Sequence, residues 1–507
     1  MEARANKVRR RSIRKARKQT RDRIRRNVRR KVAEMAFGRT HFGAAVLGDK
    51  RRTDRLVKMA DTIAMHPGGT LPDKFKNPAE LEAVYRLMNN EAVTHEAVIA
   101  SHCALTRQRM AEESGVVLVL HDTTELQYTT LKSIKDLGPV GNGLDRGYLC
   151  HNSLAVVPGT RQVLGLASQI LHTRRKVPAK ETAQQKREHP DRESRLWKRG
   201  CEAVGPAAPG KRVVDIFDAG ADAFELLDHE HANNRLYVLR AGKDRLLGGE
   251  NAEQIEQVKR KLYEHVRGLA DLGGRYVTIR ANINKRNGKK LKKKQTARDA
   301  KVRIAAGPIT LGVPSITRGE HGQESLGLWA LIVSEVNAPE GVEPVEWILL
   351  TNVPVNSLEE AAERVDWYAC RPIVEEFHKA QKTGCGIENP QFTTKAALEP
   401  IIGILSVAAV MLLDLRHQAR RPDADKVRAT TVMPRLYVRV LSAWRWGKPK
   451  INMSIYDCFM ALGRLGGHQN RKSDGPPGWL TLWRGWNDLH LMVMGARAAG
   501  LKKCDER

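Results

Sequence analysis

Four polar side chains in the last third of the chain have types and a spacing that suit phosphate and metal chemistry. Tyr368, Arg371, Glu375 and Lys382 fall within one narrow stripe when Asp366–Gly384 is read as a helix at about 100° per residue. A carboxylate beside a phenol, a guanidinium and an ammonium could bind a metal ion next to a phosphate. The ordinary interpretation is a solvated helix surface with a Glu–Lys ion pair. This stretch alone favours the ordinary interpretation, and the rest of the chain has to decide.

Two earlier aspartates complete a candidate acidic centre. Asp122 ends an apolar run that starts at Val116, and Asp218 ends another that starts at Arg212. Such runs predict strands that are buried on both faces. Two neighbouring carboxylates repel each other unless a cation lies between them, and hard oxygen ligands favour Mg²⁺ or Mn²⁺. With Glu375 as a third carboxylate, two ions about 4 Å apart could activate the attacking oxygen and stabilise the leaving oxygen of a phosphodiester.

The choice of aspartates has alternatives. An aspartate at a strand end is often a turn residue or a helix cap. Asp215 and Asp222 compete with Asp218 on pattern alone. Asp215 lies within the strand, an odd number of residues from Asp218, so their side chains point to opposite faces.

The order of the predicted elements brings Asp122 and Asp218 to neighbouring strand ends. Two strand-like runs at 148–157 and 163–172, joined by a Pro-Gly turn, follow Asp122. A long charged helix is predicted over Lys180–Cys201, before the strand that ends at Asp218. Hairpin-like strands, a helix and another acid-tipped strand are the order expected of a ribonuclease H-like core. The predicted fold class is α/β, a ribonuclease H-like catalytic core with a β-rich insertion, flanked by N-terminal and C-terminal helical domains.

The β-rich insertion is predicted between the second acid and the Glu375 helix. Short strand-like runs recur at 236–240, 275–283, 301–304, 309–313, 328–336 and 346–350. Arg240 and Trp347 lie on two of these runs. A lone tryptophan is usually a core residue, but it could also stack on a base displaced from a duplex. The basic loop Asn284–Lys294 is either a solvated hairpin or a DNA-backbone contact, and its charge density favours DNA. The loop residues predicted to bind DNA are Lys289, Lys290, Lys292 and Lys293.

The N-terminal region is strongly basic. Residues 1 to about 36 are dense in Arg and Lys, and should be disordered or form a helix against a polyanion. The alternative is a non-specific solubilising tail. A small helical domain is predicted over residues 38–110. Lys50, Arg51 and Arg52 lie near the start of one of its helices, where side chains and backbone N–H groups could contact phosphates together.

Composition favours a nucleic-acid partner. The 507 residues carry a formal net charge of +30, and the sequence pI is about 10.0. Such a field attracts nucleic acid or an anionic membrane surface. The longest apolar run, Ile401–Leu413, is too short to cross a bilayer and suits a buried core helix. Seven scattered cysteines and no apolar signal region predict a cytoplasmic chain with reduced thiols.

These motifs together resemble the bacterial cut-and-paste insertion-sequence transposases with an Asp-Asp-Glu core and a Tyr-(2)-Arg-(3)-Glu-(6)-Lys signature. The signature spacing is met by Tyr368, Arg371, Glu375 and Lys382. His121–Tyr128 and Asp218–Asp222 resemble the two aspartate motifs. Further similar segments are Leu47–Thr53 and Ala83–Arg86 for end recognition, Tyr237–Arg240 and Glu346–Thr351 for DNA contact, and Gly478–Trp486 for dimerisation. The resemblance covers roughly residues 38–500, and the basic arm has no counterpart.

The resemblance implies a homodimer that binds the inverted-repeat ends of a transposon and target DNA as double strands. Asp122, Asp218 and Glu375 would be the catalytic metal ligands for two Mg²⁺ (or Mn²⁺) ions per active site. A metal-activated water would nick one strand, and the freed 3′ hydroxyl would form a hairpin and later attack target DNA. Tyr368, Arg371 and Lys382 would hold phosphates, Arg240 would grip the end, and Trp347 would stack on a flipped base. The implied location is the bacterial cytoplasm, at the nucleoid, with no membrane partner.

The predicted domains follow from these assignments. Their bounds are 1–37 for a basic arm, 38–110 for a helical end-binding domain, 111–235 for the first part of the core, 236–355 for the insertion, 356–390 for the catalytic Glu helix, and 391–507 for a helical dimerisation domain. C-terminal helices are predicted at 397–416, 431–446 and 478–498. Two other functions remain: a ribonuclease H-like structure-specific DNA nuclease or resolvase without strand transfer, and a catalytically silent DNA-binding inhibitor of transposition.

One proline interrupts the signature stretch. Pro372 lies between Tyr368 and Glu375 and should kink a helix or begin a new one. Ser357 with Glu360 has the pattern of a capping box that opens a helix upstream. We therefore expect a helix break between Tyr368 and Glu375.

Overall fold

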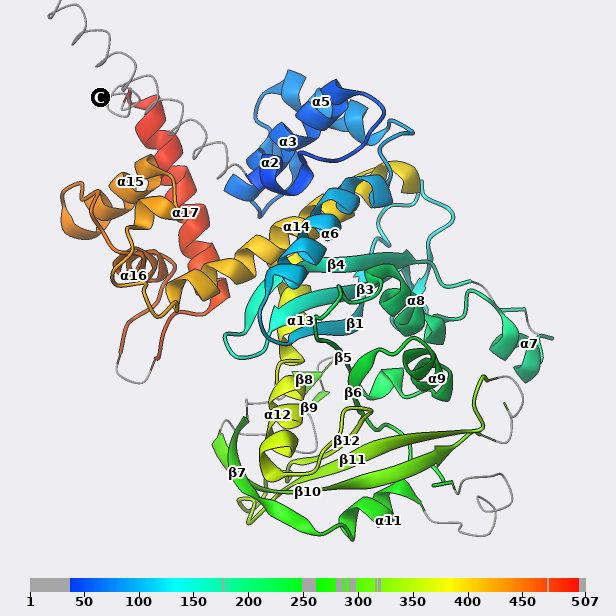
Figure 1. The fold of residues 1–507 in the computed structure, drawn as a ribbon. Helices are drawn as coiled ribbons and strands as arrows, with labels where there is room; N and C mark the ends of the chain where they lie inside the picture. The colour runs from blue at the N-terminus through cyan, green and yellow to red at the C-terminus, as the bar shows by residue number, and fades with distance from the viewer. Residues whose placement is uncertain are drawn as a thin grey trace, which may run out of the picture. The chain divides into compact units, whose positions relative to one another are not determined.

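The chain divides into two units in the computed structural model (Figure 1). The sheet unit is Cys103–Ala380, and the helical unit joins the residues up to His102 to those from Gln381 onwards. The structure describes residues 37–175, 177–178, 180–248, 261–279, 285–286, 289–290, 298–314, 317, 321–471 and 474–500. Apart from Phe37, the predicted basic arm lies outside these ranges.

Within the described part of the sheet unit, ten strands form one mixed sheet. The order is β2-β3-β1-β5-β6-β12-β11-β10-β7, and β4 also pairs with β3. The strands are β1 (Val117–Gln127), β2 (Gly138–Val140), β3 (Asp145–Val157), β4 (Gln162–His172), β5 (Val213–Phe217), β6 (Leu236–Arg240), β7 (Asp271–Ile279), β10 (Arg298–Gly312), β11 (Ser325–Glu335) and β12 (Glu346–Thr351). A separate pair consists of β8 (Lys285–Arg286) and β9 (Lys289–Lys290).

The two acid-bearing strands are parallel neighbours. Val117–Leu120 of β1 pairs with Val213–Ile216 of β5. On the other side of β1, strand β3 runs antiparallel to it, and β4 runs antiparallel to β3. On the far side of β5, strand β6 is again parallel. The central residues Leu118, Val119 and Leu120 are fully buried, as expected for strands covered on both faces.

The predicted strands at 148–157, 163–172 and 212–217 are confirmed, but the prediction for Asp122 needs a correction. β1 continues past Asp122 to Gln127, so Asp122 lies within the strand, opposite Asn152 of β3. β3 remains paired with β1 along this stretch, whereas the parallel pairing with β5 ends at Leu120. Asp122 therefore lies where β1 has lost one of its two neighbours.

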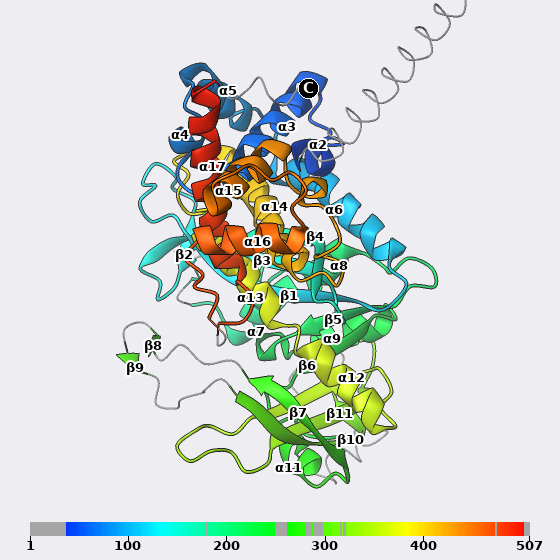
Figure 2. The same ribbon diagram turned by 90° about the vertical axis from the view of Figure 1, so that its left-hand side faces the viewer.

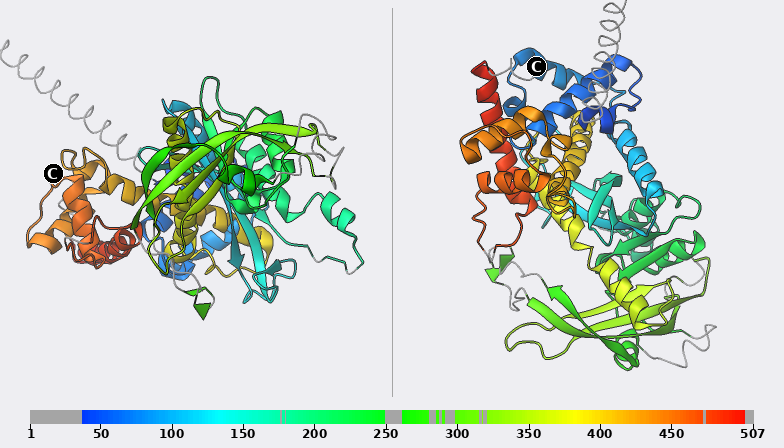
Figure 3. Two further views of the ribbon diagram at one scale, coloured as in Figure 1. Left: turned by 90° about the horizontal axis from the view of Figure 1, so that it is seen from below. Right: turned by 60° about the vertical axis from the view of Figure 1, so that its left-hand side comes forward.

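The helices of the sheet unit pack on the strands (Figure 3). α8 (Leu196–Val204) contacts β3 and β4, α9 (Phe224–Ala232) contacts β6, and α11 (Leu262–Arg267) contacts β10 and β11. α12 (Leu358–Tyr368) contacts β10 and β6, and α13 (Pro372–Lys379) contacts β1. Two short 3₁₀ segments, η1 (Glu193–Arg195) and η2 (Ala219–Ala221), precede α8 and follow β5.

The long helix predicted over Lys180–Cys201 is wrong. Helix α7 (Ala183–Glu188) ends before Pro190, and helical structure resumes at Glu193 with η1 and then α8. Proline lacks a backbone N–H and disfavours a helical conformation in the residue before it, which explains the break.

The predicted strands at 301–304 and 309–313 form one long strand, β10, instead of two. Its Pro308 pairs with Trp329 of β11, whereas β7 pairs only with the stretch of β10 up to Ala305. Pro308 therefore lies where β10 has a partner on one side only, and such an edge position tolerates proline. β12 pairs antiparallel with β6, so these strands extend the same sheet.

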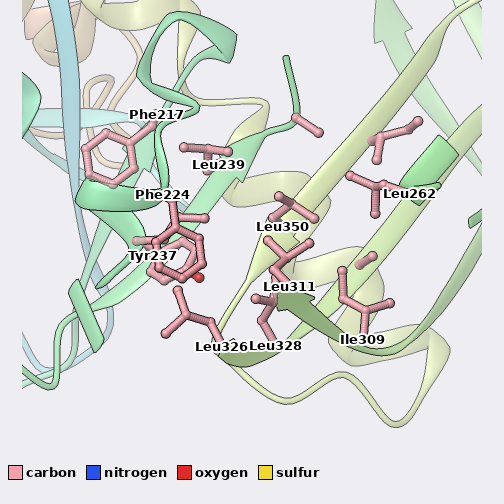
Figure 4. Packing of buried hydrophobic residues seen from close by; sticks show 14 of the residues in the cluster. Phe217, Phe224, Tyr237, Leu239, Leu262, Ile309, Leu311, Leu326, Leu328 and Leu350 are labelled. Carbon is pink, nitrogen blue, oxygen red and sulfur yellow. The ribbon is translucent and has the colours of Figure 1, made fainter. Parts of the chain in front are cut away.

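A large hydrophobic core anchors the end of β5 (Figure 4). Phe217, Tyr237 and Leu239 are fully buried, and they pack with Phe224 of α9 and Leu350 of β12. The next residue after Phe217 is Asp218, whose side chain is 29% exposed. The core thus fixes the backbone that presents Asp218 to the surface.

The helical unit combines segments from both ends of the chain (Figure 2). Its helices are α2 (Phe37–Phe42), α3 (Lys50–Met65), α4 (Leu71–Lys74), α5 (Pro78–Met88), α14 (Lys395–Ala419), α15 (Arg435–Trp446), α16 (Ile455–Leu465) and α17 (Trp479–Ala498). The chain passes between the units within α6 (His95–Glu112) and at the start of the π-helical turn η4 (Ala380–Gly384). The three predicted C-terminal helices are confirmed, and α16 was not predicted.

α14 is the central helix of this unit and contacts α3, α5, α16 and α17. By length and composition it could cross a membrane, but 83% of its most apolar window is buried inside the protein. The prediction of a buried core helix over Ile401–Leu413 is therefore confirmed.

Candidate active site and DNA-binding domain

Three carboxylates of the sheet unit converge on one guanidinium. Arg371 Nη2 lies 3.2 Å from Asp122 Oδ2 and 3.2 Å from Asp218 Oδ2. Arg371 Nη1 lies 2.5 Å from Glu375 Oε1. The three acids come from β1, from the residue after β5, and from the first turn of α13. Residues far apart in the sequence thus form one acidic centre around a cation.

Each aspartate of this centre is held by a backbone N–H group. Asp122 Oδ1 accepts a hydrogen bond from Thr123 N at 2.8 Å. Asp218 Oδ1 accepts one from Gly220 N at 2.9 Å, because Asp218 is the N-cap of η2. In both residues the remaining oxygen, Oδ2, faces Arg371. The cap and the acidic-centre interpretations of Asp218 are therefore compatible.

The helix break predicted at Pro372 is confirmed. α12 opens with the Ser357 cap, whose side chain accepts from Glu360 N, and it ends at Tyr368. Pro372 is the first residue of α13, where its missing N–H costs no helical hydrogen bond. Arg371 lies at the junction, and its N–H donates to Tyr368 O. Because of this break, Arg371 is the N-cap of α13 and Glu375 lies in its first turn.

The pKa shifts in the centre reflect the interaction between the carboxylates and the guanidinium of Arg371. Burial raises the pKa of Asp122 to about 6, against the lowering effect of Arg371, and Asp218 adds to the rise. Burial disfavours the charge of Arg371, but the three carboxylates together raise its pKa above the ordinary value. Without a cation, three neighbouring carboxylates would not all stay ionised.

Tyr368, Arg240 and Trp347 form a second group beside the acids. The rings of Trp347 and Tyr368 meet edge to face, with centroids 5.5 Å apart. Tyr368 is buried, and burial raises its pKa, whereas the nearby Arg240 and Arg371 lower it. Trp347 is half-buried, so it is not an enclosed core residue. The structure thus brings these three residues together next to Arg371.

The other residues predicted to bind DNA belong to the helical unit, to β9 or to the part of the chain outside the described residues. Lys382 belongs to the helical unit, where its Nζ lies 3.6 Å from Glu388 Oε1. At the start of α3, Lys50 is exposed, whereas Arg51 pairs with the N-cap Asp49 and Arg52 donates to Leu47 O. The backbone of Lys289 and Lys290 forms β9, and Lys292 and Lys293 lie outside the described residues.

The sequence did not reveal a buried polar network beneath the acidic centre. His121 Nε2 lies 2.9 Å from Asp215 Oδ1, and Arg235 Nη2 lies 2.7 Å from Asp215 Oδ2. Burial would raise the pKa of Asp215, but Arg235 and His121 lower it below the ordinary value. The ionised carboxylate can only accept, so Nε2 of His121 donates to it.

The same network extends to Glu230 and Cys201. Burial and the neighbouring Asp215 hold the pKa of Glu230 well above its ordinary value. Cys201 Sγ lies 3.9 Å from His121 Nε2, so the ligand atoms of His121, Cys201 and Asp215 cluster. Because Arg235 already neutralises Asp215, this cluster is a buried ion-pair network. The odd offset of Asp215 from Asp218 was its only sequence signal.

A cavity of about 570 Å³ in the sheet unit is lined by more basic than acidic side chains. Its acidic lining residues are Glu188, Glu225 and Asp228, and none of the three carboxylates of the acidic centre lines it. Arg195 and Arg245 in its wall pair with Glu225 and Asp222. Its basic lining residues are Arg187, Arg192, Arg195, Lys198, Lys243 and Arg245.

Comparison with known families identifies the N-terminal part of the chain. Residues 34–93 match a family described as "Transposase DNA-binding". The match covers α2 to α5, including the basic start of α3. The chain therefore carries a transposase-type DNA-binding domain, and DNA is its partner. With its large mixed sheet, and helices in the N-terminal and C-terminal parts of the chain, the protein is of the mixed α/β type.

Proposed function

We propose that the chain is a DNA transposase that cuts and joins DNA by divalent-ion chemistry at Asp122, Asp218 and Glu375. The observation that carries this proposal is the guanidinium of Arg371 shared by these three carboxylates. The transposase DNA-binding match supports DNA as the substrate. The strand order β4-β3-β1-β5-β6, with β1, β5 and β6 parallel, supports a ribonuclease H-like core.

The donor set fits Mg²⁺ or Mn²⁺. Carboxylate oxygens are the ligands that these ions prefer, and three of them already converge on one cation from three separate elements. Asp122, Asp218 and Glu375 would hold two ions. Ions bound there would activate the attacking oxygen and neutralise the leaving oxygen of a phosphodiester.

The residues around the acids would position DNA. Backbone N–H groups of Thr123 and Gly220 hold Oδ1 of the two aspartates, which would leave their Oδ2 atoms to bind the ions that act on the phosphate. The half-buried indole of Trp347 would stack on an unpaired base near the cut end. Arg240 and Tyr368 beside it would contact the phosphates that flank this base. Lys382 and the lysines of residues 289–293 would add backbone contacts, which carry most of the affinity for DNA.

Cut-and-paste transposition requires two ends in one complex. We propose a homodimer, formed through the C-terminal helices 391–507, as the cutting species. The helical domain that includes α2 to α5 would recognise the inverted repeats. The proposed location is the bacterial cytoplasm, in contact with chromosomal DNA.

The test begins with the genomic DNA that flanks the coding region, where the proposal predicts terminal inverted repeats. Purified chain is incubated with Mg²⁺, DNA that carries these repeats, and a target plasmid. Nicking, hairpin formation and joining to the plasmid would support a transposase. Cutting without joining would instead indicate a nuclease or resolvase, and metal-independent binding without cutting would indicate a catalytically silent inhibitor.

A further inference from the structure

Arg371 occupies the same carboxylate oxygens that a divalent ion would need. Asp122 Oδ1 and Asp218 Oδ1 are already bound to backbone N–H groups, at 2.8 and 2.9 Å. The other oxygen of each aspartate is Oδ2, and both Oδ2 atoms lie 3.2 Å from Arg371 Nη2. The guanidinium thus lies at the two oxygens that a metal ion shared by Asp122 and Asp218 would also contact.

We propose that Arg371 is a built-in counter-cation of the acidic centre, which a divalent ion must displace before the centre becomes active. This inference rests on the proposed function and assigns to Arg371 a role besides phosphate binding. Under this proposal, Arg371 controls the affinity of the centre for metal ions as well as a contact with DNA.

Charge and geometry both favour displacement over shared occupancy. A guanidinium and a divalent ion at the same carboxylates repel each other at short range. Both terminal nitrogens of Arg371 are engaged, Nη2 by the two aspartates and Nη1 by Glu375. The guanidinium thus competes at every one of the three ligands.

The move requires only the side chain. The backbone of Arg371 is fixed between α12 and α13 by its N–H bond to Tyr368 O, and its side chain is 18% exposed. Arginine has a long side chain whose planar fork binds phosphate as well as carboxylate. Once displaced, the guanidinium is available to a DNA phosphate, the contact expected from the sequence.

The counter-cation has two consequences. It holds three carboxylates together in the metal-free protein, where their mutual repulsion would otherwise separate β1 from α13. It also raises the concentration of divalent ion needed to fill the centre. Removal of the guanidinium should therefore strengthen metal binding, whereas loss of an arginine that only orients the carboxylates would weaken it or leave it unchanged.

The test measures the binding of Mn²⁺ alone to the full chain by titration calorimetry. Arg371→Gln removes the charge and should bind Mn²⁺ at least about tenfold more tightly than the wild type, since one charge-assisted contact is worth about this factor. Arg371→Lys keeps a charge without the fork and should fall between the two. Arg275→Gln is the matched control, because Arg275 pairs with Asp366 of α12 and should leave Mn²⁺ affinity unchanged.

Two further readouts keep the inference separable from the proposed function. Circular dichroism must show that each variant is folded, and Arg371→Lys provides the comparison if Arg371→Gln is not. Equal or weaker Mn²⁺ binding by the folded Arg371 variants would overturn the counter-cation role. If Asp122→Asn abolishes Mn²⁺ binding while the Arg371 variants match the wild type, only this inference fails. If neither the wild type nor any Arg371 variant binds Mn²⁺, both the inference and the proposed metal centre fail.

Discussion

Asp215 lies within β5, and Asp218 directly follows the strand. Replacing Asp215 by alanine tests whether Asp215 stabilises the fold whereas Asp218 serves the proposed chemistry. Asp215 is 1% exposed and is the shared acceptor of His121 and Arg235, at 2.9 and 2.7 Å. Without Asp215, the buried Arg235 keeps only Glu230, at 3.5 Å, as a carboxylate partner among the described residues, and breaking a buried ion pair costs about 3–5 kcal/mol. Asp215→Ala should therefore lower the free energy of unfolding of the sheet unit by about this amount.

Asp218→Ala is the matched comparison. The side chain of Asp218 is 29% exposed. When Asp218 is replaced by alanine, Arg371 keeps Asp122 and Glu375 as partners. Loss of a partly exposed pair changes stability by about 1 kcal/mol or less. Asp218→Ala should leave stability almost unchanged and abolish metal-dependent cutting.

Urea-induced unfolding at neutral pH, followed by circular dichroism and tryptophan fluorescence, measures both variants. An Asp215→Ala change below about 1 kcal/mol would refute the structural role of Asp215. Equal destabilisation by Asp218→Ala would refute the division of roles. Arg235→Met in the Asp215→Ala background should recover part of the loss, because it removes a buried cation that has lost its nearer carboxylate partner.

Three further predictions concern the helical unit. Burial lowers the pKa of His490 to about 4, so the unfolded chain binds the proton more tightly, and stability should fall by about 1 kcal/mol as the pH drops from about 6.5 towards 4. Denaturant titrations at several pH values should show this slope reduced in His490→Gln. The buried ammonium of Lys74 donates to the carbonyls of Pro67, Gly68 and Gly69, so Lys74→Met should destabilise the DNA-binding domain by about 1–3 kcal/mol in thermal or urea unfolding. Lys50→Ala should lower the salt dependence of DNA affinity, with a change of about 0.9 in the slope of log K against log[salt], measured by fluorescence anisotropy.

Each of these has a contradicting result. An unchanged pH slope in His490→Gln would mean that burial of the His490 imidazole does not weaken its proton binding. Wild-type stability of Lys74→Met would mean that the three carbonyls find other donors. An unchanged salt slope for Lys50→Ala would place this lysine away from the phosphates.

Much of the acidic centre could be predicted from the sequence, because its strands and its helix are indicated by residues close to each acid in the chain. The apolar runs before Asp122 and Asp218 determine buried strands, and Pro372 determines where α13 begins. Tyr368, Arg371 and Glu375 then lie at the junction of α12 and α13, where Arg371 contacts Asp122 and Asp218. The extension of β1 past Asp122 was missed because it depends on pairing with β3, a long-range contact.

The remaining features arise only from tertiary contacts. Arg235 and Glu230 carry no local signal, yet they flank Asp215 in a buried network. Arg371 was expected at phosphates, and its place among the carboxylates follows from how α13 packs on β1. Pro308 in β10 is tolerated because β7 ends before it, which no local pattern reports.

The most direct test of the proposed function is strand cleavage by the Glu375→Gln chain. Glu375 is 55% exposed and on the surface of α13, so this change should preserve folding and DNA binding. On DNA that carries the flanking terminal repeats, the wild type should cut in the presence of Mg²⁺, and Glu375→Gln should bind the same DNA without cutting it. Full cleavage by Glu375→Gln would contradict the assignment of Asp122, Asp218 and Glu375 as the catalytic centre.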